Sequence, residues 1–168
     1  NNFVSTLIDL INKSKLAKRK SKLTNHELVL IILALTPALH PNFLTALISI
    51  LLPEGGDFPE FGGVKGKKHR GLIPTGETAQ FILAGDDLEQ RLEVQKLFSS
   101  DHWFAKEHIL WLEDVPEGEP IMSGRIILAP EIVEELTLGK VSRPRFGADF
   151  PAEYVETYMD WEDLVLVP

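Results

Sequence analysis

The chain has 168 residues, of which 44% are apolar and 25% are charged, the ordinary mixture of a globular protein. It has no cysteine, which excludes disulfides, thiolate metal ligands and a cysteine nucleophile. The net charge is -8, although residues 1–22 hold six basic groups and one acid, so the acidic remainder disfavours general binding to nucleic acid. We expect residues 1–22 to form a basic amphipathic helix and residues 23–168 to form the main domain.

No targeting or membrane segment is expected. The apolar residues between Phe3 and Ile11 precede the nearby basic residues, whereas a secretory signal has its basic residues first. The longest apolar run, residues 28–35, is far too short to cross a bilayer. These features predict a cytoplasmic protein with no membrane partner, and the absence of cysteine is compatible with a reducing compartment.

The first predicted element is a helix that begins near Phe3, because apolar residues recur there at helical spacing. Its end is expected to be the basic stretch KSKLAKRKSK, residues 13–22, since lysines suit the dipole at a helix C-terminus. A solvated helix end is the favoured interpretation of this stretch. A surface that faces phosphate or a membrane is the alternative.

Two helices that are apolar nearly all round are predicted next, over residues 25–35 and 42–52. Thr24 or Asn25 is expected to cap the first of them, and Pro37 is expected to end it. Prolines bound the second on both sides. Because neither helix has a polar face, we expect both to be buried.

Residues 53–76 are expected to form a long loop rich in glycine and proline, fixed by its apolar side chains Phe58, Phe61, Leu72 and Ile73. Its stretch FGGVKGKKHRGLIPTGET has the composition of a phosphate-binding loop. The Walker A pattern fails, because Gly66-Lys67 is followed by a lysine and no strand precedes the loop. The stretch is interpreted as a solvated basic loop or as a contact for phosphate, nucleic acid or an acidic partner, with four candidate residues: Lys65, Lys67, Lys68 and Arg70.

The second half of the chain predicts two further helices, a hairpin and a short helix. Thr75 is expected to cap a helix that ends at Gly85, and Asp86 or Asp87 to start the next. The later elements are strands over residues 108–115 and 124–129 and a helix between Pro130 and Gly139. The result is an α+β fold, mainly helical with a small β-hairpin, and helices followed by a two-stranded wing are winged-helix-like.

No catalytic or metal-binding residue is predicted. The run ILWLED, residues 109–114, imitates a Walker B strand, but without a Walker A loop it is interpreted as a buried strand that ends in solvent. The five histidines show no metal-ligand spacing, and the chain has no Gly-x-Ser-x-Gly motif. An independent enzyme is therefore the least favoured function.

Four longer stretches, HRGLIPTGETAQFILAGDDLEQR, LFSSDHWF, GEPIMSGRIILAPE and DWEDLVL, point to a family. Over roughly residues 38–168 the chain resembles the winged-helix-like N-terminal region that precedes the AAA-type ATPase module of a group of bacterial ATP-binding proteins. The resemblance implies a longer parent protein that binds ATP and Mg²⁺, hydrolyses ATP and works as a ring. It implies no catalytic residue and no cofactor in this chain, whose last residues are expected to lead into the missing ATPase core.

Two functions follow from this resemblance and from the charges. The leading one is a non-catalytic recognition or regulatory domain that docks protein clients or the ATPase ring, with contacts from Tyr154, Tyr158 and Trp161. The alternative for these aromatic residues is that they close the domain's own core. The second function is a winged-helix domain that binds nucleic acid through residues 65–70, with residues 18–20 as further candidate contacts. Against it, the helix after the predicted hairpin carries Glu131, Glu134 and Glu135.

Overall fold

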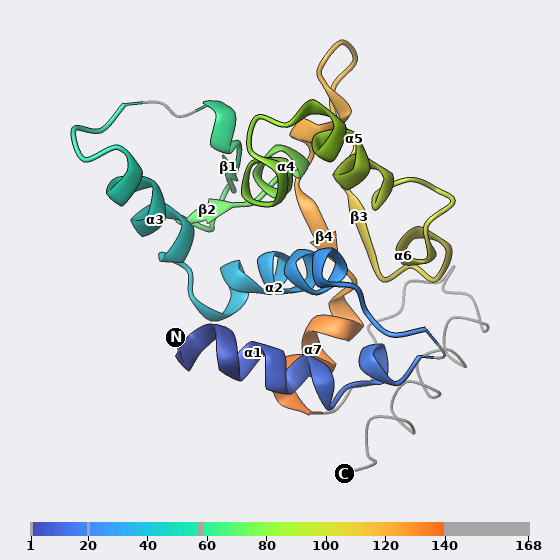
Figure 1. Cartoon of the computed structure of the whole chain (residues 1–168). Coiled ribbons are helices and arrows are strands. Elements are labelled where there is room, and N and C mark those ends of the chain that lie inside the picture. Colours follow the sequence, from blue (N-terminus) through green and yellow to red (C-terminus); the bar gives the residue numbers. More distant parts are fainter. Residues whose placement is uncertain (1, 20, 57–58, 140–168) are drawn as a thin grey trace, which may run out of the picture. The chain divides into compact units, whose positions relative to one another are not determined.

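The computed structural model of the chain describes residues 2–19, 21–56 and 59–139 (Figure 1). Within these residues it has seven α-helices and two small antiparallel sheets, which confirms a mainly helical α+β fold. The chain divides into two compact units. Of the described residues, those up to Leu28 and residues 129–139 form one unit, and those between Val29 and Leu128 form the other. The expected division after residue 22 stays a prediction.

The first unit contains α1 (Asn2–Asn12), the 3₁₀ turn η1 (Lys15–Lys18) and α7 (Pro130–Leu138). As predicted, a proline opens α7 and Gly139 ends it in the left-handed conformation, at φ +76°. Helix α1 contacts both other elements. The apolar side chains buried in this unit are Leu7, Ile11, Leu16, Ala129, Ile132 and Leu136.

The basic stretch after α1 is not the end of that helix, so this expectation was wrong. Helix α1 stops at Asn12, and Ser14 then starts the 3₁₀ turn. The buried hydroxyl of Ser14 donates to the carbonyl of Ile11 at 2.6 Å and accepts from the amide of Leu16 at 3.2 Å. Serine favours such local bonds over a continuing helix, and here they begin a new turn.

Helix α2 (Asn25–Leu39) begins as predicted but extends further. Thr24 and Glu27 form a reciprocal capping box, in which each side chain accepts from the other residue's amide, at 3.1 Å and 2.9 Å. Pro37 lies inside the helix and does not end it. Proline already has a helical φ, and the helix continues past it because the amide of His40 donates to the carbonyl of Thr36 at 2.8 Å.

Helix α3 (Phe43–Leu51) is much less buried than its composition predicts. Only Leu44 is buried, Leu51 is exposed and Ile50 is 74% exposed, whereas α2 buries Leu30, Ile31, Leu33 and Leu35. In the part of the chain that the structure describes, no single helix is long and apolar enough to cross a membrane. Taken together, α2 and α3 have the length and composition of a membrane span, but the chain bends by 107° between them.

The predicted loop of residues 53–76 contains regular structure, which corrects that expectation. The second unit has here a 3₁₀ turn, η2 (Pro59–Phe61), and a hairpin of two short strands, β1 (Val64–Lys65) and β2 (Leu72–Ile73). Of the apolar residues expected to fix the loop, Phe61 is buried, the two residues of β2 are half-buried, and Phe58 lies outside the described residues.

The rest of the second unit follows the predicted order. Its elements are α4 (Gly76–Ala84), α5 (Leu88–Lys96), α6 (Trp103–Lys106), β3 (Leu110–Leu112), the 3₁₀ turn η3 (Ile121–Ser123) and β4 (Ile126–Leu128). Strands β3 and β4 form the predicted hairpin, with Leu110 opposite Leu128 and Leu112 opposite Ile126. Helices α4 and α5 pack against each other, but Leu88 and Leu92 of α5 are exposed and only Val94 is buried.

Strand β4 also pairs on its other side. Thr75 forms a β-bridge with Arg125. The amide of Gly76 donates to the carbonyl of Gly124 at 3.1 Å, and the amide of Ile126 donates to the carbonyl of Pro74 at 2.9 Å. The last described strand therefore lies between β3 and the segment that enters α4. This arrangement joins the start of the helical pair to the hairpin that follows it.

Candidate functional site

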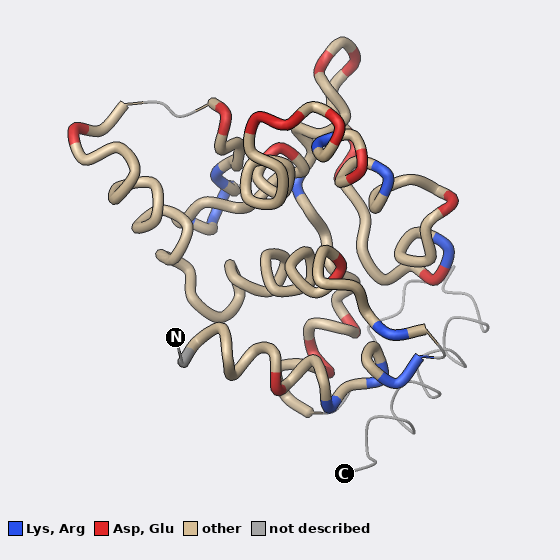
Figure 2. Tube along the Cα trace, viewed as in Figure 1, with Lys and Arg blue, Asp and Glu red and all other residues tan. Residues whose placement is uncertain are grey.

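The four predicted basic residues lie together on an exposed hairpin. We define the basic hairpin as residues 64–73, in which Val64 pairs with Ile73 and Lys65 with Leu72. The turn between the strands is GKKHRG, and Lys65, Lys67, Lys68 and Arg70 are all exposed. None of the four is paired with an acidic side chain of the described residues, and Figure 2 shows their positive charges gathered at β1 and β2. The predicted basic loop is therefore the tip of a hairpin.

Thr75 connects the basic hairpin to the start of α4. Its buried hydroxyl lies 3.1 Å from the amide of Gly63 and 3.4 Å from that of Thr78, which it caps. The hydroxyl of Thr78 in turn accepts from the amide of Thr75 at 3.0 Å, so the predicted cap is a full capping box. The backbone that leads into β1 requires glycine at position 62, because Gly62 has φ +70° and a Cβ there would lie 2.7 Å from the Thr75 hydroxyl.

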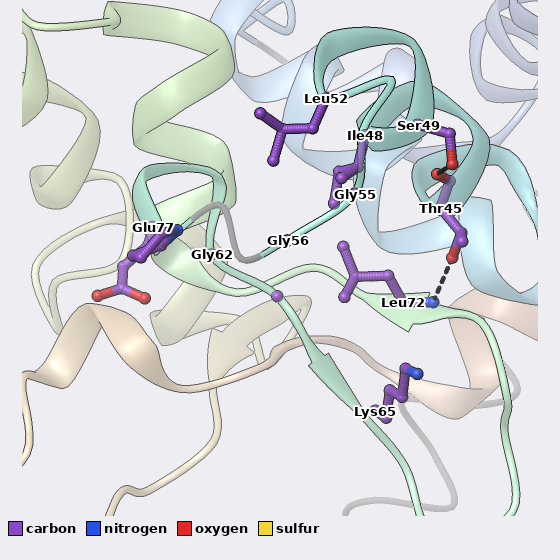
Figure 3. A pocket seen from close by; sticks show the side chains of 12 residues that line it. Thr45, Ile48, Ser49, Leu52, Gly55, Gly56, Gly62, Lys65, Leu72 and Glu77 are labelled. Atoms are coloured by element: carbon purple, nitrogen blue, oxygen red, sulfur yellow. Dashed lines mark hydrogen bonds between the residues drawn. The ribbon is translucent and has the colours of Figure 1, made fainter.

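The other strand of the basic hairpin is held against α3. The amide of Leu72 donates to the hydroxyl of Thr45 at 3.3 Å (Figure 3). Gly71 lies so close to the carbonyl of Pro41 that a Cβ at this position would collide with that backbone oxygen. The chain before α3 and the end of the basic turn are therefore in direct contact, and this contact helps to position the basic hairpin against α3.

A groove with a volume of about 670 Å³ lies between α3, the basic hairpin and the start of α4 (Figure 3). Its apolar side chains are Ile48 and Leu52 from α3 and its C-terminus, and Leu72 from β2. Lys65 and Glu77 contribute a positive and a negative charge. The remaining lining residues are small or polar: Thr45, Ser49, Gly55, Gly56, Pro59, Gly62 and Gly63.

The surface at α5 and at the loop between β3 and β4 is acidic. Asp87 caps α5 by accepting from the amide of Gln90 at 3.2 Å, and Asp86, Glu89 and Glu93 are exposed beside it. The exposed acids of the loop are Asp114, Glu117 and Glu119, and Figure 2 shows the acidic residues of both regions. The cations of these regions are engaged: Arg91 donates to the carbonyl of Gly85 at 2.8 Å, Lys96 forms an ion pair with Glu93, and Arg125 forms one with Glu113.

The other predicted site residues are not brought to this groove. Tyr154, Tyr158 and Trp161 lie outside the described residues. Over residues 2–19, 21–56 and 59–139, no group of three or more histidine, aspartate or glutamate side chains could hold a metal ion. The imidazole of His102 instead accepts from the amide of Phe104 at 3.0 Å and so starts α6.

A buried carboxylate on α7 was missed by the sequence analysis. Glu135 is only 3% exposed, and neither of its oxygens has a hydrogen-bond partner within the described part of the chain. Burial raises its pKa to about 7, while the positive charge of Lys15 acts in the opposite direction. The helical spacing of Ile132, Glu135 and Leu136 could have revealed it, because this spacing puts the glutamate on the apolar face.

Comparison of the chain with protein families, with curated proteins and with solved structures found no match.

Proposed function

We propose that this chain is a non-catalytic domain that recognises protein partners, and that it precedes an AAA-type ATPase module in a longer bacterial protein. The observation that carries the first part is the acidic charge of α5 and of the loop between β3 and β4. These are the two regions that a domain of this topology would place against nucleic acid. The second part rests on the resemblance over residues 38–168.

We also propose that the domain is winged-helix-like, and the order and pairing of its elements support this. The segment of residues 74–76 leads into α4 and α5, and β3 and β4 follow, with β4 paired on both sides. A winged helix has this order, with its strands paired around the last one. In the DNA-binding members of such helix-turn-helix folds, the second helix of the pair enters the major groove. That helix would be α5.

The charges on this surface oppose binding to DNA. Nucleic-acid affinity comes largely from basic side chains that displace the counterions of phosphates. Helix α5 instead presents Glu89 and Glu93, and its Lys96 is paired with the second of these. Because the loop between β3 and β4 adds three more exposed acids, a phosphate backbone would be repelled at both contacts. Protein recognition is therefore better supported than binding of nucleic acid as the function of this domain.

In the proposed longer protein, the ATPase module and this domain have different roles. The ATPase module would bind ATP and Mg²⁺ and hydrolyse the nucleotide, and this domain would present the partner on which the ring acts. Tyr154, Tyr158 and Trp161 are the proposed contacts with that module. The expected result is that the purified chain hydrolyses no ATP above the background of a buffer control, and that the longer protein does. Hydrolysis by the chain itself would contradict a non-catalytic role.

The basic hairpin is the one observation that favours nucleic acid as a second candidate. Its four cations have no acidic partner among the described residues and could contact phosphates in a different orientation from that of a winged helix. Such a contact would carry no sequence information and would weaken steeply with salt. We therefore use the salt dependence of binding to separate the two functions.

In a fluorescence-anisotropy titration, we expect labelled duplex and single-stranded DNA to show no binding to the chain at physiological salt. Weak binding at low salt is expected to disappear when Lys65, Lys67, Lys68 and Arg70 are replaced by alanine. The matched control replaces four exposed lysines elsewhere, namely Lys13, Lys22, Lys96 and Lys106. Binding that persists at physiological salt and is lost only in the hairpin variant would reject protein recognition in favour of nucleic acid.

A further inference from the structure

We propose that the groove between α3 and the basic hairpin binds an extended peptide segment that carries acidic residues next to an aliphatic or aromatic side chain. The inference rests on the proposed protein-recognition function and names the class of partner. It assigns the binding to a particular groove of the second unit, away from the acidic residues of α5. Three features of the groove argue for this occupant.

The first feature is apolar surface that the described chain leaves uncovered. Ile48, Leu52 and Leu72 line the groove with apolar surface, and none of the three is fully buried. Helix α3 buries a single side chain, although seven of its nine residues are apolar. An apolar patch next to a groove is typical of an interaction site. A partner side chain that enters the groove would remove this surface from water.

The second feature is the charge beside this apolar floor. Lys65 is directly opposite Leu72 in the hairpin, so both side chains lie on the same face of the strands and both line the groove. Lys67, Lys68 and Arg70 follow at the turn and have no acidic partner among the described residues. A cationic cluster of this kind selects an acidic partner and disfavours a basic one. The occupant therefore needs carboxylates next to its apolar side chain.

The third feature is an open strand edge. Within the described residues, β1 pairs with β2 and with no other strand, so its outer backbone groups are available to an added strand. Gly62 and Gly63 precede β1 and present no side chain to an approaching backbone. Peptides commonly bind by extending such an edge, with the backbone giving affinity and the adjacent pockets giving specificity. The volume of about 670 Å³ suits a few side chains of a short segment.

The experiment is a selection of random twelve-residue peptides, displayed on phage, against the full chain. Three variants are selected in parallel and checked by circular dichroism for an unchanged fold. The first reverses the charge of the hairpin by replacing Lys65, Lys67, Lys68 and Arg70 with glutamate. The second is Ile48→Ser, which makes the groove floor polar. The third, Ile50→Ser, is the matched control, because Ile50 lies on the same helix but does not line the groove.

We expect the wild-type chain to enrich peptides in which aspartate or glutamate adjoins leucine, isoleucine or phenylalanine. A synthetic peptide of that consensus should bind the charge-reversed variant and Ile48→Ser about tenfold more weakly, a loss of about 1.4 kcal/mol. Ile50→Ser should bind it like the wild-type chain. The charge-reversed variant should enrich basic peptides in place of acidic ones, which a merely unfolded variant would not do.

Two outcomes would overturn the proposal in different ways. Enriched peptides whose affinity is the same for wild type, Ile48→Ser and the charge-reversed variant would remove the groove and leave protein recognition standing at another surface. The absence of any enriched acidic and apolar consensus would reject this partner class. If labelled DNA binds the chain at physiological salt, both the proposed protein-recognition function and this proposal fail.

Discussion

Replacing Thr75 with valine is expected to lower the free energy of unfolding by about 2 kcal/mol. Valine keeps the shape of the side chain but removes the hydroxyl that accepts from the amides of Gly63 and Thr78. The amide of Thr78 would lose this partner at a buried position and that of Gly63 at a half-buried one, which costs more than the loss of an exposed bond. The measurement is urea denaturation followed by circular dichroism.

The control for this variant is Thr45→Val, on α3. The hydroxyl of Thr45 also accepts from an amide of the basic hairpin, that of Leu72, but the bond is exposed and water can replace it. We expect a change of about 0.5 kcal/mol or less at this position. Hydrogen exchange adds a local test, since the amide of Gly63 should exchange faster in Thr75→Val. Equal stabilities of the two variants would show that Thr75 does not join the hairpin to α4.

A second large effect is expected at Glu135, as a dependence of stability on pH. Its pKa is raised from the usual 4.5 to about 7 in the folded chain, so between these values the folded state binds more protons than the unfolded state. The free energy of unfolding therefore falls as the pH rises through this range. Below pH 4.5 the carboxyl is neutral in both states, and above pH 7 the full penalty of the buried charge is present.

Replacing Glu135 with leucine should remove this penalty and raise the free energy of unfolding by about 1–3 kcal/mol at pH 8. The difference in stability between the two proteins should shrink as the pH falls from 8 toward 4.5, and its change across this range isolates Glu135 from the other titrating groups. Glu135→Gln should abolish the same pH dependence while it keeps a polar side chain. Glu134→Gln is the control, because it leaves the carboxylate at position 135 in place. A constant difference between wild type and Glu135→Leu at every pH would show that the carboxylate does not titrate in this range.

The sequence by itself determined the elements whose ends depend on bonds between residues three or four positions apart. Thr75 caps its helix as predicted, and Thr24 and Asp87 are the caps at the two starts where the sequence left a pair of candidates. Each side chain accepts from an amide within the first turn of its helix. The predicted boundaries of α7, a proline at its start and Gly139 at its end, depend on φ preferences that each residue carries with it. The failure of the Walker A pattern was also a local property, readable from three consecutive residues.

Only the tertiary structure decided that residues 64–73 form the basic hairpin and which segments surround it. The hairpin depends on the pairing of Val64 with Ile73, and its attachment to α3 depends on the hydrogen bond between Leu72 and Thr45. The spacing of apolar positions along the sequence predicts neither contact. The exposure of a helix was equally non-local: α2 and α3 are both rich in apolar residues, yet α2 buries Leu30, Ile31, Leu33 and Leu35, whereas α3 buries only Leu44. Local bonds fix where an element begins and ends, whereas burial depends on which distant segments pack against it. Helix α3 contacts β2 but buries only Leu44, and the groove lies along the part of it that the described residues leave open.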